Sequence, residues 1–405
     1  MNQEINKKGD LKMAKTAIKA GVIGCGNISL VYIPNICQHY KNVEIVAVAD
    51  LIRERSEKAA ADNNIPKVYE TDELLADPEI EIVLNLTTPQ SHYEINKKIL
   101  EAGKHVYCEK PLALSLDEAD ELVELANAKG LYCTGAPDTF LGAGLQTVRN
   151  LIEDGAIGRV TGFTANLWQH GSELWHPAPH FLYKRGAGPM LDMGPYYVQA
   201  LVTILGPIDE IFCYCTCPTP KRPIQGELFD VEVDTSYVSV VKFKNGITGT
   251  LTASFDVWKS KLPHFEFYGD DGVIFGPDPN MFRGPVYLFD GKGLEALVNS
   301  KEGFLAKVMT LNGPENESFM HEVEIQHAYE NETPMGNMRG MGVSDLASAI
   351  ISGRKPRLSA ELSRHVVEAL LGFKVSSDSG QPYKMTTTCE KPAPVPKGLE
   401  CWAID

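Results

Sequence analysis

The sequence predicts an α/β protein of two domains, a doubly wound parallel sheet followed by an α+β domain with a large, open, mostly antiparallel sheet. From Lys19 to about Ala136, short apolar runs alternate with amphipathic stretches of helical period, which is typical of βαβ units. After residue 158 the apolar residues recur in period two, as in strands that bury one face. The chain has 405 residues, enough for two or three domains.

In the first domain, β-branched and apolar runs predict parallel strands over 20–24, 43–50, 80–88, 104–111 and 131–136. Apolar residues at helical spacing predict helices over 53–64, 91–103 and 115–130. Ser115 and Glu118 form a capping box at the start of the last of these helices, which satisfies two free amide groups there. Strands and helices therefore alternate throughout this part of the chain.

The second domain is expected to open with one helix over 140–158 that a glycine closes. Period-two alternation then predicts strands over 159–168, 208–217, 233–243, 247–258, 264–274 and 284–290. Asn245-Gly246 and Asp290-Gly291 are typical of hairpin turns. Apolar residues at helical spacing again predict helix over 343–380. Residues 294–340 show no regular spacing, and no helix or strand is predicted there.

These patterns divide the chain into a polar N-terminal tail, two domains and a C-terminal tail. The predicted limits are 1–16, 17–137, 138–385 and 386–405. The last helix of the second domain can pack back on the first.

Composition excludes several classes of function. Thirty-eight basic against 53 acidic residues leave a net charge of −15, so the net field repels nucleic acid and anionic membranes. The sequence contains no apolar run long enough for a membrane helix and no apolar secretory signal. Nine scattered cysteines fit reduced thiols better than a disulfide framework. We expect a cytoplasmic protein with neither a nucleic-acid nor a membrane partner.

A glycine-rich turn directly follows the first predicted strand. The run Gly21–Ser29 matches Gly-x-Gly-x-x-Gly with serine in the last place, and contains Gly24, Gly26, Asn27 and Ile28. Such a turn lets the backbone approach a pyrophosphate at a helix N-terminus. Asp50 ends the next strand, where a carboxylate accepts from a ribose 2′-hydroxyl and repels a 2′-phosphate. The pattern predicts NAD rather than NADP. The alternative is a simple strand-to-helix turn.

Further motifs follow in a specific order along the chain. They are TTPQSH (87–92), GKHVYCEKP (103–111) and GPMLDMGPYY (188–197). With the glycine turn, they make the chain resemble the Gfo/Idh/MocA oxidoreductase family over roughly residues 17–380. The resemblance implies a Rossmann domain, NAD(P), a sugar or cyclitol substrate, and a homo-oligomer formed through the large sheet. The implied cofactor-binding residues are Gly24, Gly26, Asn27, Ile28, Asp50, Thr87, Pro89, His92, Glu109 and Lys110.

By this resemblance Lys110 is the catalytic lysine. A cation beside the reacting hydroxyl stabilises the alkoxide that develops as hydride leaves. Burial beside a positive nicotinamide ring is expected to lower the pKa of Lys110 from its ordinary value of about 10.4. The lysine would then also serve as a proton relay. The alternative is a solvated surface lysine at the end of a strand.

The second family motif departs from the common pattern Asp-x-Gly-x-His. Asp192 and Gly194 match, but Tyr196 stands in the place of the histidine. The resemblance implies that Asp192 orients the substrate hydroxyl and Lys110, and that Tyr196 transfers the proton. Tyr197, also a predicted substrate contact, is the alternative reactive tyrosine, and a third possibility is that both tyrosines only pack a helix start.

An aromatic and histidine cluster precedes this motif. Trp175 offers a flat face for a sugar ring, and His176 and His180 are alternative bases if Tyr196 is not the base. Plain loop packing is a competing interpretation. The cluster has no helical pair of histidines, and two prolines interrupt it, so no metal is expected.

The leading functional hypothesis is an NAD-dependent oxidoreductase acting on a carbinol of a sugar, glycoside or cyclitol. A variant of it keeps NAD bound, recycles it, and oxidises ring carbon C3. The alternative from another class is a non-catalytic NAD-binding regulator of sugar metabolism. That regulator would have no need of Lys110 and Asp192, and both are present.

Overall fold

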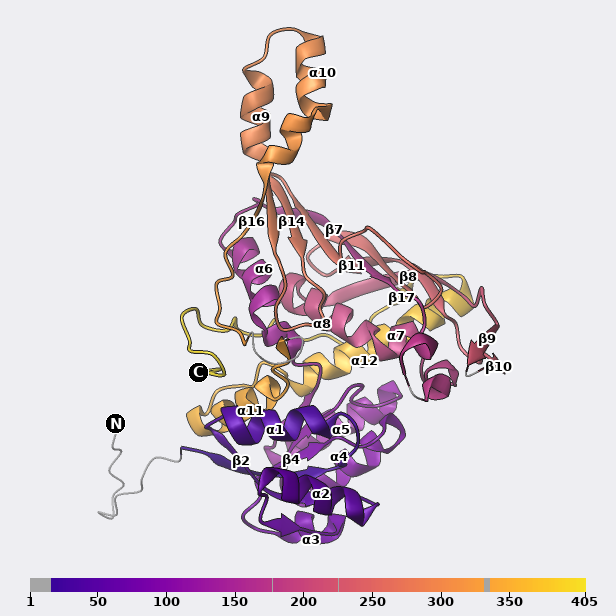
Figure 1. Cartoon of the computed structure of the whole chain (residues 1–405), viewed down its shortest axis with the longest axis vertical. Helices are drawn as coiled ribbons and strands as arrows, with labels where there is room; N and C mark the ends of the chain where they lie inside the picture. The colour runs from indigo at the N-terminus through magenta and orange to yellow at the C-terminus, as the bar shows by residue number, and fades with distance from the viewer. Residues whose placement is uncertain (1–15, 177, 225, 331–335) are drawn as a thin grey trace, which may run out of the picture.

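The structure is a computed structural model that describes residues 16–176, 178–224, 226–330 and 336–405 (Figure 1). Its first sheet has six parallel strands in the order β3-β2-β1-β4-β5-β6. The strands are β1 Ile18–Ile23, β2 Val43–Ala49, β3 Lys67–Val68, β4 Ile82–Asn85, β5 His105–Cys108 and β6 Cys133–Gly135. The helices are α1 Ser29–His39, α2 Arg53–Asn63, α3 Thr71–Ala76, α4 His92–Glu101 and α5 Leu116–Lys129. This confirms the Rossmann-type domain.

The central strands of this sheet are buried on both faces, since helices cover each side. All four residues of β4 are buried, which explains why the sequence shows a continuous apolar run there. The strand order reverses between β1 and β4, and ligands of such sheets bind where this happens, beyond the carboxyl ends of the strands. The fold therefore places the functional site at that edge.

The second sheet has nine strands in the order β16-β15-β14-β13-β7-β12-β11-β8-β17. They are β7 Val160–Trp168, β8 Ile208–Thr216, β11 Ser236–Phe243, β12 Thr248–Ser254, β13 Phe265–Gly269, β14 Gly272–Gly276, β15 Tyr287–Asp290, β16 Met320–Glu322 and β17 Tyr383–Lys384. Every neighbouring pair is antiparallel except β7 with β12. The predicted open, mostly antiparallel sheet is confirmed. A separate hairpin joins β9 Lys221–Ile224 to β10 Glu227–Asp230.

Three local predictions for this domain are wrong. The segment 264–274 is a hairpin of β13 and β14, because Asp270 and Asp271 form its turn. Asp290 caps a helix instead of turning a hairpin, since its side chain accepts from the amide of Gly293. The helix expected over 140–158 is only α6, Ala143–Glu153. At Gly142 the chain is extended, and a Cβ there would clash with the carbonyl oxygen of Phe282.

The irregular segment 294–340, for which the sequence predicts no helix or strand, contains most of a helical arm. The arm consists of α9 Gly291–Asn299, α10 Phe304–Asn312 and a short 3-10 helix, Pro314–Phe319, and it connects β15 to β16. Figure 1 shows it standing clear of the end of the large sheet, far from the Rossmann domain. No residue of this arm belongs to the predicted site.

Two helices bring the end of the chain back to the first domain. They are α11 Met341–Ser352 and α12 Ala360–Ser379, as the helical period predicts. The long helix α12 contacts α5 and β6 of the Rossmann domain, and also α8 and β8 of the second domain. In the described ranges, none of the helices has the length and hydropathy that crossing a bilayer requires.

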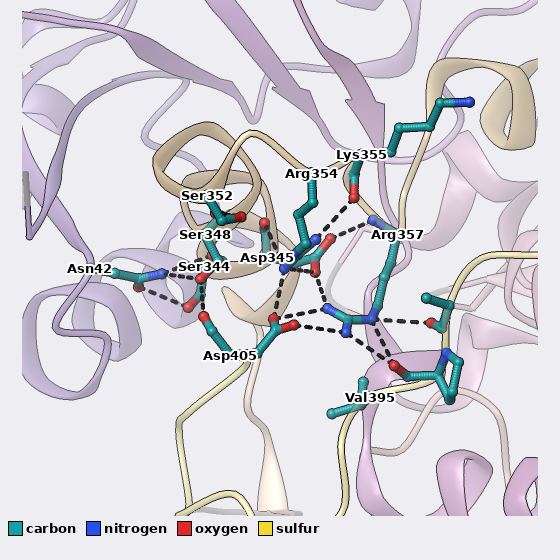
Figure 2. Close-up of polar contacts among 12 residues, drawn as sticks. Asn42, Ser344, Asp345, Ser348, Ser352, Arg354, Lys355, Arg357, Val395 and Asp405 are labelled. Carbon is teal, nitrogen blue, oxygen red and sulfur yellow. Dashed lines mark hydrogen bonds and ion pairs between the residues drawn. The ribbon is translucent and has the colours of Figure 1, made fainter. Parts of the chain in front are cut away.

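The C-terminal segment is held by a buried ion network (Figure 2). Asp345 of α11 is fully buried and accepts from Arg357 Nη1 at 2.6 Å and Arg354 Nη2 at 2.7 Å. Arg357 also contacts the Asp405 carboxylate through two bonds of 3.0 Å. Ser348 donates to the backbone oxygen of Asp405. The last residues of the chain are therefore tied to α11.

His365, a buried histidine of α12, is expected to make the stability of the protein depend on pH. Ile208 N–H donates to His365 Nε2 at 2.9 Å, and His365 Nδ1 lies 2.9 Å from Thr387 Oγ1. Because Nε2 accepts, the ring is neutral, and burial lowers the pKa of His365 from 6.5 to about 4. The folded pKa lies below the unfolded one. The contribution to stability is therefore complete above about pH 6.5, and it is lost as pH falls toward 4.

We expect the free energy of unfolding to fall by on the order of 2–3 kcal/mol across this window through His365 alone. Urea denaturation midpoints measured at several pH values will show it. In His365→Gln the glutamine oxygen can still accept from the amide of Ile208, so the hydrogen bond is kept. Because glutamine does not titrate, the fall in stability with falling pH should become shallower. An unchanged slope in that variant would contradict the assignment.

Candidate active site

The glycine turn lies directly after β1, at the edge that the strand order selects. Gly24 has φ +98°, and a Cβ there would lie 2.7 Å from the carbonyl carbon of Leu86. Gly26 differs, because no atom lies within 4 Å of its Cβ position. The first glycine is thus required by the packing of the protein itself, whereas the second leaves open space beside the start of α1. That space fits a pyrophosphate.

Asp50 supports this turn at the end of β2. Its Oδ2 accepts from the amide of Cys25 at 2.7 Å, and its Oδ1 accepts from the amide of Ile52 at 2.8 Å. The carboxylate therefore lies beside the glycine turn, where the predicted ribose contact requires it. Asn27 and Ile28 continue the turn up to the first residue of α1. These residues fit NAD as the dinucleotide.

The other predicted cofactor residues lie in the loops after β4 and β5. Pro89 is partly exposed, and Thr87 donates to Asn85 Oδ1 through its amide and its hydroxyl. His92 is fully buried, and its ring lies 2.7 Å from the oxygen of Pro111 and 3.2 Å from that of Thr87. His92 therefore connects the loop after β4 to the loop after β5.

The two glycines allow a matched test of the cofactor site. We expect Gly26→Ala to fold normally, because its methyl group meets open space, but to raise the Kd for NAD about tenfold or more by blocking the pyrophosphate. Gly24→Ala should instead lower the free energy of unfolding by about 1–3 kcal/mol. Calorimetric titration and thermal unfolding check both variants. Normal NAD affinity in Gly26→Ala would contradict the placement.

Lys110 forms the centre of the predicted chemical site. It follows β5, and its Nζ donates to Asp192 Oδ1 at 2.7 Å and to the Asp192 backbone oxygen at 2.6 Å. Asp192 ends the short helix α7 Pro189–Asp192, and Tyr196 lies in the first turn of α8 Gly194–Leu205. The ammonium group lies 5.3 Å from the centre of the Tyr196 ring. The structure thus brings three predicted catalytic residues together.

The environment of Lys110 sets its protonation. Burial acts to lower the pKa of this lysine, but the charges of Asp192, Tyr196 and Glu109 outweigh it and hold the pKa above its ordinary value. The predicted lowering refers to a lysine beside a positive nicotinamide ring and stays a prediction; what the sequence does not show is how close Asp192 lies. Lys110 is thus a cation whose position Asp192 fixes.

Glu109 faces inward beside Lys110. It is buried and accepts from Tyr32 Oη at 2.8 Å and from the Lys110 amide at 3.0 Å. Tyr32 belongs to α1, the helix that starts at the glycine turn. Glu109 therefore links α1 to the loop that carries Lys110.

The remaining predicted residues lie apart from this group. Tyr197 is fully buried and lies 2.6 Å from His264 Nδ1. Trp175 is exposed, and its ring packs edge-on against His176, while His180 packs edge-on against Phe229. Within the described ranges, no hydrogen bond or ion pair joins these four predicted residues to Lys110 or Asp192. Their substrate roles stay predictions.

Sequence reasoning missed one residue at the site. Arg339 precedes α11 and donates from Nη2 to Tyr196 Oη at 3.1 Å and to Asn280 Oδ1 at 3.0 Å. It belongs to the irregular segment 294–340, which has no periodicity that could indicate where its side chains point.

Among the described residues, no cluster of three potential metal ligands occurs.

A glycine-rich turn after the first strand, with a lysine, a carboxylate and a tyrosine grouped at the carboxyl edge of the same parallel sheet, defines a two-domain protein with an N-terminal dinucleotide-binding fold of the Rossmann type. Comparison with known families agrees with this class. Residues 18–135 match the model described as an oxidoreductase family with an NAD-binding Rossmann fold, and residues 145–275 match the Gfo/Idh/MocA C-terminal domain. The chain belongs to the Gfo/Idh/MocA family, and its first domain is an NAD-binding domain.

Individual relatives are distant. Myo-inositol 2-dehydrogenase of Thermotoga maritima is 26 % identical over 68 % of this chain and 79 % of its own length. Trans-1,2-dihydrobenzene-1,2-diol dehydrogenase of Mus musculus is 28 % identical over 55 % of this chain and 62 % of its own. The matches span 60, 52 and 62 % of the length of the first three curated relatives.

Solved structures share the whole fold. Levoglucosan dehydrogenase in complex with NADH and L-sorbose superposes with a TM-score of 0.76 at 18 % identity, covering 92 % of this chain and all of its own. At 18 % identity this likeness shows a shared fold.

Proposed function

We propose that the chain is an NAD-dependent oxidoreductase that oxidises or reduces a carbinol of a sugar, a glycoside or a cyclitol. The observation that carries this proposal is the group of Lys110, Asp192 and Tyr196 at the carboxyl edge of the parallel sheet, beside the glycine turn. Relatives named as inositol and levoglucosan dehydrogenases support the substrate class.

NAD, when bound, accepts or returns the hydride of the carbinol carbon. The protein then has to hold the carbinol oxygen and move its proton. Lys110 is held by Asp192, and as a cation it binds the oxygen and stabilises its negative charge. Tyr196 gives a proton to this oxygen in reduction and takes it back in oxidation. Asp192 keeps the ammonium group in place.

The proposal extends to three finer points. The first is that Trp175, His176 and His180 contact the sugar. In support, the rings of Trp175 and His176 pack edge-on, and His180 packs against Phe229, in the domain that also carries Tyr196. The second is that NAD stays bound and is recycled, with oxidation at ring carbon C3. The third is a homo-oligomer formed through the large sheet, where β11 alternates buried with exposed residues and leaves Val238 and Val240 exposed.

The test starts with protein purified without added cofactor. Its absorbance and mass show whether NAD co-purifies, and a screen of sugars, glycosides and inositols then follows the absorption band of reduced nicotinamide. Reduction without release of the cofactor supports recycling, whereas turnover only with added NAD supports an ordinary dehydrogenase. NAD binding without turnover on any carbinol would favour the non-catalytic regulator.

A further inference from the structure

The segment before α11 is anchored to the helix that starts at the glycine turn. Asn35 of α1 donates from Nδ2 to the backbone oxygens of Asn337 and Arg339, both at 3.0 Å. Tyr40, which follows α1, donates to the backbone oxygen of Met338 at 2.6 Å. The backbone that carries Arg339 is therefore fixed by the Rossmann domain.

A buried carboxylate holds the other side of the same segment. Asp138, which follows β6, accepts through Oδ2 from the amide of Gly340 at 2.9 Å and from that of Gly342 at 3.1 Å. Asp138 is itself buried. The backbone at Arg339 is thus bonded on both sides, which fixes the point from which its side chain starts.

The side chain crosses to the second domain and ends at the phenol of Tyr196. A guanidinium has only donors, so Tyr196 Oη accepts from Arg339 and its own proton points elsewhere. Asn280 Oδ1 accepts from the same Nη2 atom at 3.0 Å and fixes its direction. The phenol is therefore held with its proton free to move to another oxygen.

Charge at the phenol oxygen is the second consequence. When Tyr196 gives up its proton, its oxygen becomes negative with the guanidinium already 3.1 Å away and the Lys110 ammonium 5.3 Å from the ring centre. Preorganised donors of this kind stabilise charge without reorganisation. Tyr196, Tyr32, Glu109 and Asp138 outweigh the burial of the guanidinium and raise the pKa of Arg339, so it stays charged.

We propose that Arg339 is a positioning residue for proton transfer by Tyr196. It fixes the phenol oxygen and stabilises the negative charge that this oxygen carries while the proton is on the substrate. The inference rests on the proposed function, in which Tyr196 moves the proton. It adds a requirement that the family motifs do not contain, because Arg339 lies outside all of them.

A double-mutant cycle on the NAD-bound enzyme tests the coupling, with myo-inositol, glucose and levoglucosan as probes. We expect Arg339→Gln to lower kcat about 100-fold and to change KM much less. In a Tyr196→Phe background the same substitution should have no further effect. Arg339→Lys should restore part of kcat. Arg159→Gln, on the surface beside Asp270, is the matched control. Equal losses in both backgrounds would overturn the proposal.

A second measurement does not depend on turnover. With tyrosine labelled by ¹³C at Cζ, the Tyr196 signal is the one that disappears in Tyr196→Phe. Arg339→Gln should shift this signal and Arg159→Gln should not. A Tyr196 signal that does not respond overturns the proposal. A signal that responds, in a protein that turns over none of the sugars, glycosides and inositols of the screen, upholds the contact of Arg339 with the phenol and counts against the proposed function instead.

Discussion

Lys110→Met is expected to lower kcat by about 10²–10⁴-fold while leaving the Kd for NAD nearly unchanged. Methionine keeps the apolar stem but removes the only group that donates to Asp192 Oδ1 in the described contacts. In the proposed mechanism the carbinol oxygen then loses the cation that stabilises its developing charge. Steady-state kinetics with added NAD and calorimetric titration of the cofactor measure the two quantities separately.

A second buried lysine offers a matched control. Lys104 lies at the opposite end of β5, where its Nζ donates to the backbone oxygens of Asp77 and Ile80 at 2.7 and 2.8 Å. Lys104→Met removes the same charge and should lower stability without lowering kcat of the folded enzyme. If Lys110→Met retained kcat within about threefold, the proposed role of Lys110 would be wrong.

The largest expected effect on stability comes from Arg357→Met. Arg357 is only 4 % exposed and its guanidinium contacts Asp345, which is fully buried, and Asp405 (Figure 2). Removing one partner of a buried ion pair leaves the other charge without full compensation, which costs about 3 kcal/mol. Urea midpoints should fall accordingly, and proteases should cut the segment 386–405 earlier than in the unmodified chain.

The control for this prediction lies in the same network. Arg354 also contacts Asp345, but its side chain is 26 % exposed. We therefore expect Arg354→Met to cost only about 1 kcal/mol or less, since solvent screens it. Equal effects of the two substitutions would show that burial does not decide the strength of this network.

Local patterns predicted the parts of the fold that local physics controls. The parallel strands follow from apolar runs, and α5 begins where Ser115 and Glu118 form their capping box. The pattern failed where a contact from far along the chain decides. Gly142 is extended where the backbone of Phe282 lies close to it, and no property of residues 140–158 shows this approach. The predicted domain limits stay predictions.

By itself the sequence determined the class of fold and the glycine turn, and it predicted Lys110, Asp192 and Tyr196 as site residues, because each of these features is written in a short motif with its own spacing. Only the tertiary structure decided how these residues act on one another. It placed Asp192 2.7 Å from Lys110, and the charge of Asp192 raises the pKa of the lysine. It also brought Arg339 to Tyr196, 143 positions away. Electrostatic effects depend on distance in space, and folding alone sets that distance.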